Sequence, residues 1–137
     1  MRIKLDMKNV GGLFTPVPDD TYKVEITAFE WNETDRGPWA KVTMLIVEGE
    51  FANERAVSDN WHFGKASLWA TKPKLEAFSG TSWDEEDMDF DSDEFIGCQA
   101  FVLTEVREYT KNDNTTGKTS NVVSYYPLPE TELEGSI

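Results

Sequence analysis

The sequence predicts an all-β domain, a five-stranded barrel with a short helix inserted after the third strand. Two observations support this fold class. Segments with alternating apolar residues, the period of a half-buried strand, recur along residues 20–127 and are separated by turn residues. Residues 65–78 instead space their apolar residues as a helix does. At 137 residues the chain fits one domain with its own core.

The first three strands form a predicted meander, in which antiparallel neighbours are joined by short turns. They are expected over residues 22–28, 39–47 and 56–63. After the first strand the alternation slips at Phe29, which indicates a β-bulge that re-aims Trp31. Residues 32–38 (NETDRGP) form the first turn and residues 48–50 the second.

The second half contains the predicted helix and two more strands. Because Pro73 is unsuited to a helix interior, we expect one helical turn before it, then a short helix capped by Thr71 and Gly80. Residues 91–97 form a capped helical turn after an acidic run. The last strands are predicted over residues 98–109 and 121–126, joined by a flexible hairpin loop at 112–117. Three strands, a helix and two strands are the order of an OB barrel.

The charge of the chain is unevenly distributed. Its net value of -13 argues at first sight against a nucleic-acid partner. However, residues 84–94 hold 8 acids and residues 130–137 hold 3, and neither segment contains a base. The remaining 15 acids face 13 bases, so the body is close to neutral and has room for a local basic groove.

Several protein classes are disfavoured by what the sequence contains. One cysteine, Cys98, allows no internal disulfide and no multi-thiolate zinc site. No run approaches the ~18 apolar residues of a membrane span, and the first residues lack a signal-peptide core, so we expect a cytoplasmic protein without a membrane partner. His62 is the only histidine, and no nucleophile motif or P-loop occurs, so we expect no enzyme activity.

One acidic motif approaches a metal-binding pattern. Asp87, Asp89 and Asp91 alternate as in a calcium loop, but the sixth position is Ser92 rather than glycine and the twelfth is Cys98 rather than glutamate. We therefore expect neither a metal nor another cofactor.

Four short segments follow one another along the chain: DTYKVEIT at 20–27, EGEFANER at 48–55, LWATKPKLEAF at 68–78 and FIGCQA at 95–100. In this order they resemble the motifs G-x-Y-x-V-x-I, V-x-G-E-F-x-G-R, A-L-W-x-x-K-x-x-L-E-A and L-I-G-K-x-A of a phage-encoded family of single-stranded DNA-binding proteins. The sequence departs from them at Asn53, where the family often has glycine, at Pro73, and in the acidic run.

The resemblance implies an OB-fold domain over residues 20–127, between an N-terminal arm (1–19) and an acidic flexible tail (128–137). It also implies binding of single-stranded DNA without sequence preference, in phage replication or recombination within the host bacterial cytoplasm. The tail, which ends in Ile137, resembles tails that recruit replication or recombination proteins. The sequence leaves open whether the chain forms a homodimer.

Binding a single strand regardless of sequence requires aromatic faces for the bases and cations for the backbone. The candidate residues are Lys23, Trp31, Arg36, Trp39, Lys41, Trp61, Lys65, Arg107, Tyr109 and Lys111. Trp39 and Lys41 share the outward face of their predicted strand, and Trp31 and Arg36 flank the first hairpin loop. For Trp61 a core position is the favoured alternative, and residues 107–111 fit a solvated hairpin tip nearly as well.

Two other functions remain as alternatives to DNA binding. Clustered carboxylates can imitate a track of phosphates, which is typical of an acidic DNA-mimic inhibitor of a host nuclease or restriction enzyme. A structural or assembly protein is the third reading of an acidic β-rich domain.

Overall fold

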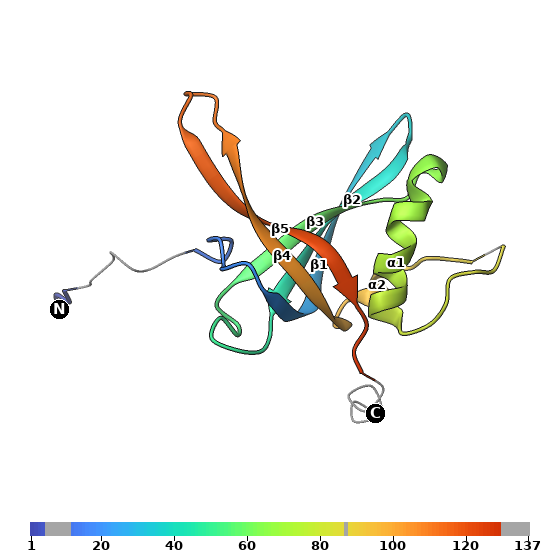
Figure 1. Ribbon diagram of the computed structural model, residues 1–137, viewed down its shortest axis with the longest axis horizontal. Coiled ribbons are helices and arrows are strands. Elements are labelled where there is room, and N and C mark those ends of the chain that lie inside the picture. The colour runs from blue at the N-terminus through green and yellow to red at the C-terminus, as the bar shows by residue number, and fades with distance from the viewer. Residues whose placement is uncertain (5–11, 87, 130–137) are drawn as a thin grey trace.

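The computed structural model describes residues 1–4, 12–86 and 88–129 (Figure 1). Its elements are β1 (Thr21–Thr34), β2 (Gly37–Ile46), β3 (Ala56–His62), a 3-10 turn (Lys65–Ser67), α1 (Leu68–Ser79), α2 (Ser92–Phe95), β4 (Gln99–Thr110) and β5 (Thr116–Tyr126). The fold is mostly β, with the main helix after the third strand. This confirms the all-β class and the predicted order of the elements.

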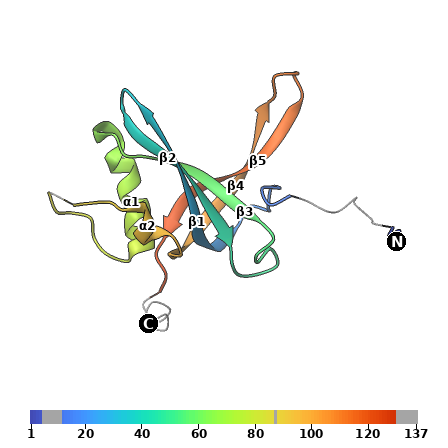
Figure 2. The ribbon, with the colours of Figure 1, turned by 180° about the vertical axis from the view of Figure 1, so that it is seen from behind.

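The five strands form one closed sheet in the order β1-β2-β3-β5-β4, and β1 also pairs with β4 (Figures 1 and 2). All neighbours are antiparallel except β3 and β5, which pair in parallel where Ser58 meets Asn121. Helix α1 lies to one side of the sheet. Closure leaves few unpaired strand edges, which limits edge-to-edge association.

A β-bulge in β1 lets this strand pair with two neighbours. The register against β2 shifts between Ile26 and Ala28, which confirms the predicted bulge but places it slightly earlier in the strand. Before the shift, Val24 and Ile26 point into the core; after it, Phe29 packs against the core.

The core lies inside the closed sheet and under α1. On β2 every second side chain is fully buried, as the alternation predicts: Ala40, Val42, Met44 and Ile46. Trp61 of β3 is also fully buried and packs against Phe78 of α1. The helix is therefore held on the sheet by large aromatic contacts.

Helix α1 is continuous through Pro73, contrary to the prediction of two short pieces. Thr71 is not an N-cap: it is buried within the helix and its hydroxyl donates to the His62 carbonyl at 2.5 Å. An interior proline costs a helix roughly 3 kcal/mol, whereas burying Leu75 and Phe78 stabilises by roughly 1.5–3 kcal/mol each. The free energy gained by packing the helix on the sheet therefore outweighs the cost of the interior proline. The Gly80 C-cap is confirmed, since its N–H donates to the Glu76 carbonyl.

The second hairpin is longer than predicted, because β5 begins at Thr116 rather than at residue 121. The connection is a short turn in which the Asp113 carboxylate accepts hydrogen bonds from the backbone N–H and the hydroxyl of Thr115. These hydrogen bonds lower the pKa of Asp113. The polar, β-branched residues of early β5 pair with β4 and so extend the ribbon.

The folded body begins before residue 20. Val17 is buried, its N–H donates to the Ser120 hydroxyl at 2.9 Å, and the Leu13 carbonyl accepts from the Ala56 N–H. The predicted arm 1–19 therefore contributes residues 13–19 to the body. At the other end Leu128 is buried too. The rest of the predicted tail, residues 130–137, lies outside the described residues. No helix in the described part is long and apolar enough to cross a membrane.

Candidate nucleic-acid interface

The outward side chains of β2 and β3 form a continuous row, which we call the outer face: Trp39, Lys41, Thr43, Ser58, Asn60 and His62. They lie in register as Trp39 opposite His62, Lys41 opposite Asn60 and Thr43 opposite Ser58. Because side chains alternate across a strand and Ala40, Val42 and Trp61 between them are buried, these six point away from the core. Aromatic, cationic and amide groups thus meet on one surface.

Trp39 and His62 form a flat aromatic platform at one end of the outer face. Their rings are nearly parallel, with centroids 5.8 Å apart. Trp39 is partly exposed and His62 exposed. A hollow of about 260 Å³ lies beside the platform and is also lined by Arg36 and Ser67. A base stacked on this platform would therefore lie near the guanidinium group of Arg36.

Lys41 lies two residues from Trp39, about 7 Å along the strand. Its ammonium group sits 5.5 Å from the ring centroid of Phe14, which is half exposed. Sequence reasoning missed Phe14, because the residues before β1 have no periodicity. The only signal was a large aromatic residue among glycines and prolines. The outer face is therefore continued by a second aromatic ring.

The turn between β1 and β2 is fixed against the start of the helical segment by two glycines. A Cβ on Gly64 would lie 2.0 Å from the Arg36 carbonyl oxygen, and one on Gly37, whose φ is 116°, would lie 2.7 Å from the Gly64 Cα. This close backbone approach brings Arg36 and Lys65, both exposed, to the same end of the outer face.

The second candidate group lies on the β4–β5 hairpin, which rises from the same side of the closed sheet as the β1–β2 hairpin (Figures 1 and 2). Tyr109 is half exposed and its ring lies against Gly117. Lys111 is exposed at the turn, whereas Arg107 is paired with Glu105 at 2.7 Å. The hairpin presents the Tyr109 ring and two cations, Lys111 and Lys118, that form no ion pair with any described residue.

Two predicted tryptophans do not belong to the outer face. Trp61 is fully buried, and its indole N–H donates to the Tyr125 hydroxyl at 3.2 Å, so it has no face for a base. Trp31 lies opposite the inward-facing Ala40, whereas Trp39 lies opposite Asn32. The two tryptophans therefore occupy opposite faces of their hairpin. Trp31 packs against Phe63 and Phe90 instead.

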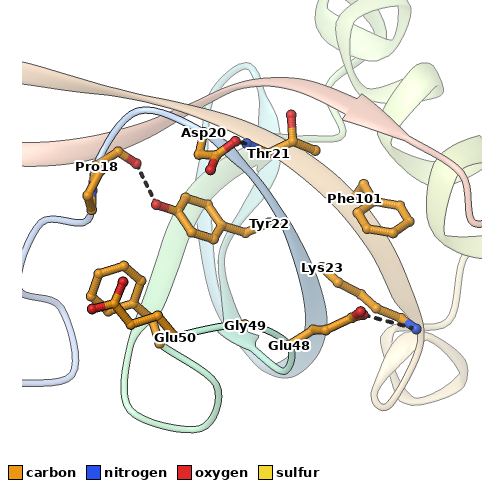
Figure 3. A pocket seen from close by; sticks show the side chains of 10 residues that line it. Pro18, Asp20, Thr21, Tyr22, Lys23, Glu48, Gly49, Glu50 and Phe101 are labelled. Atoms are coloured by element: carbon orange, nitrogen blue, oxygen red, sulfur yellow. Dashed lines mark hydrogen bonds and ion pairs between the residues drawn. The ribbon is translucent and has the colours of Figure 1, made fainter.

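Lys23 lies elsewhere as well. It forms an ion pair with Glu48 and faces a hollow of about 330 Å³ whose rim also carries Asp20 and Glu50 (Figure 3). Tyr22 donates to the Pro18 carbonyl at 2.6 Å in the same place. Burial, followed by the nearby carboxylates, raises the pKa of Tyr22. Three carboxylates around one lysine make this hollow unsuited to phosphate.

Comparison with known proteins adds no relatives: no protein-family model matches the sequence, and the search of curated proteins found no match. Within residues 1–4, 12–86 and 88–129, no three His, Cys, Asp or Glu side chains gather closely enough to hold a metal ion. The outer face therefore has to be interpreted from its own chemistry.

Proposed function

We propose that the chain is an OB-fold protein that binds single-stranded DNA without sequence preference, along the outer face and between the two hairpins. The observation that carries the proposal is the Trp39–His62 platform beside Lys41 on β2 and β3. OB folds bind oligonucleotides on this part of the sheet and with the loops of these two hairpins. Stacking on aromatic rings tolerates any base, because every base has a π-face.

The distribution of ion pairs supports the same surface. Within the described part of the chain, Lys72, Lys74 and Arg107 each form an ion pair with a carboxylate. By contrast, four cations near the outer face form no ion pair with any described residue: Arg36, Lys41, Lys65 and Lys111. Phosphates could therefore be neutralised there without breaking an internal ion pair. Because these cations are few, the affinity should fall only gently with salt.

The resemblance of the sequence to phage-encoded single-stranded DNA-binding proteins adds a biological role to this proposal. Coating of single strands during phage replication or recombination in the host cytoplasm needs no catalytic group. Residues 130–137, which carry 3 acids and no base, would contact replication or recombination proteins.

Intrinsic tryptophan fluorescence, titrated with oligo(dT) at low and high salt, tests the proposal. We expect saturable quenching that weakens as salt rises, and a gel shift with single-stranded but not double-stranded DNA. RNA of the same length, in a third lane, tests the preference for deoxyribose. Absence of both quenching and gel shift at low salt would overturn the proposal and favour a DNA mimic or an assembly protein.

A further inference from the structure

A second exposed aromatic surface lies at the start of α1 and shares no lining residue with the hollow beside the Trp39–His62 platform. There α1 and the segment after it, which runs alongside the helix (Figures 1 and 2), enclose an apolar pocket of about 300 Å³. Phe63, Leu75, Trp83 and Phe90 line it. Its size suits one or two large side chains of a partner.

The floor of the pocket is held in place by internal contacts. The Trp83 indole N–H donates to the Ser79 hydroxyl at 3.0 Å, and its backbone N–H donates to the Glu76 carboxylate at 3.2 Å. The ring of Phe90 stacks on Phe63 with centroids 4.6 Å apart. These contacts tie the segment after α1 to the helix and the sheet, so the pocket exists before a partner arrives.

The rim of the pocket, in contrast, is apolar and open to solvent. Trp69 is 79% exposed and Leu68 is 44% exposed, and the exposed Met88 also lines the pocket. The Trp69 indole N–H donates no hydrogen bond to the part of the chain that the structure describes. An exposed tryptophan among other apolar side chains is typical of the residues that dominate protein–protein interfaces.

The charge around this rim is negative. The one cation of the pocket, Lys72, is held by the carboxylate of Asp84, which also raises the pKa of the ammonium group. Glu85 and Glu86 line the pocket, are exposed, and form no ion pair with a described residue. This field repels the phosphates of nucleic acid and equally repels the chain's own acidic residues 130–137. It attracts cations.

We propose that this pocket docks a cationic peptide segment of a partner protein. An apolar or aromatic side chain of the segment inserts against Trp69, and flanking lysine or arginine side chains pair with Glu85 and Glu86. The docking surface goes beyond the proposed DNA binding, because none of its lining residues belongs to the Trp39–His62 platform.

Fluorescence anisotropy of labelled peptides against the full chain tests the proposal. The probes are KKLFKK, which has both required features, EELFEE with the charge reversed, and KKSGKK without the apolar pair. We expect KKLFKK to bind at least about tenfold more tightly than either of the others. KKSGKK controls for the general attraction of a cationic peptide to an acidic protein.

Variants locate the peptide on the surface. Trp69→Ala and the double variant E85Q/E86Q should each weaken KKLFKK binding about tenfold. Matched controls, Tyr126→Ala for a half-exposed aromatic residue and E30Q/E33Q for two exposed acids of β1, should bind as the parent chain does. Because all of these side chains are exposed, the melting temperature should stay unchanged.

Two results would overturn the docking site. One is that KKLFKK binds no more tightly than KKSGKK, or binds the Trp69→Ala variant unchanged. The other is that oligo(dT) displaces the peptide, which would assign the pocket to nucleic acid. Oligo(dT) binding by Trp69→Ala, measured in parallel, separates this outcome from a failure of the proposed DNA binding.

Discussion

Among single residues, Trp39 is the one from which the proposal expects the largest share of DNA binding. It contributes to the fold through its outward stack on His62 and not through the core. Trp39→Ala should therefore weaken oligo(dT) binding by roughly 1–3 kcal/mol, the usual value of one stacked base. Anisotropy of a labelled oligonucleotide measures the loss, and circular dichroism confirms that the fold persists.

The matched control is Trp69→Ala, because Trp69 is a more exposed tryptophan in acidic surroundings on α1. It should bind oligo(dT) as the parent chain does. If Trp39→Ala binds normally, or if both variants lose affinity equally, the outer face is not where the bases stack.

Tyr125 is the central residue of a partly buried polar network between β3, β5 and α1. Its hydroxyl donates to the Asp59 carboxylate at 2.5 Å, and the same carboxylate accepts from the Lys74 ammonium at 2.8 Å. Burial and then the Asp59 charge raise the pKa of Tyr125 well above its ordinary value. The folded state therefore keeps the phenolic proton at a pH where the unfolded state loses it.

This network predicts a loss of stability at high pH. A tyrosine in the unfolded chain ionises near pH 10, so its contribution is complete below about pH 10 and is lost as the pH rises toward the folded-state pKa. Urea unfolding between about pH 9 and pH 11 should show a steeper loss for the parent chain than for Tyr125→Phe. Parallel curves for the two proteins would contradict the network.

Among the elements, the β1–β2 hairpin depends on one backbone contact. Gly64 has a φ of -63°, which any residue adopts, so only the steric clash with the Arg36 carbonyl forbids a side chain there. Gly64→Ala should cost about 1–3 kcal/mol, the range for overpacking, and weaken oligo(dT) binding by moving Arg36. Thermal unfolding measures the first effect. The control Gly12→Ala, with open space around its Cβ, should change neither the melting temperature nor oligo(dT) binding.

Sequence patterns predicted the elements best where one face is buried. The strict alternation of β2 followed from its inward row, because a one-residue slip would expose Val42 and Met44. Pro73 and the start of β5 were predicted wrongly for the opposite reason. Packing of α1 on the sheet outweighs the local cost of the proline, and residues 116–120 lie in a ribbon without an apolar face.

The site was less predictable than the strands, because it depends on which face each side chain takes and on contacts between distant segments. The bulge in β1 puts Trp31 and Trp39 on opposite faces, although they are equally aromatic in the sequence. Phe14 reaches Lys41 because the chain before β1 is held at the start of β3, where the Leu13 carbonyl accepts from the Ala56 N–H. Neither the placement of the two tryptophans nor the Phe14–Lys41 contact produces a periodic pattern that the sequence would show.

At the scale of the whole molecule, the net charge of -13 opposes DNA binding, and part of it comes from residues 130–137. Truncation after Leu128 removes 3 carboxylates and no base. We expect nearly unchanged thermal stability and tighter oligo(dT) binding, most visibly at low salt, where charges are least screened. Weaker binding or a lower melting temperature would show that these residues belong to the site or the body.

The most direct test of single-strand binding by the outer face is ultraviolet crosslinking of the full chain to oligo(dT), with the crosslinked peptides identified by mass spectrometry. The proposal predicts crosslinks at Trp39 and His62 on the sheet and at Tyr109 on the second hairpin. Crosslinks confined to Trp69, Trp83 and the acidic segment after α1, or no crosslinks at saturating oligonucleotide, would contradict it.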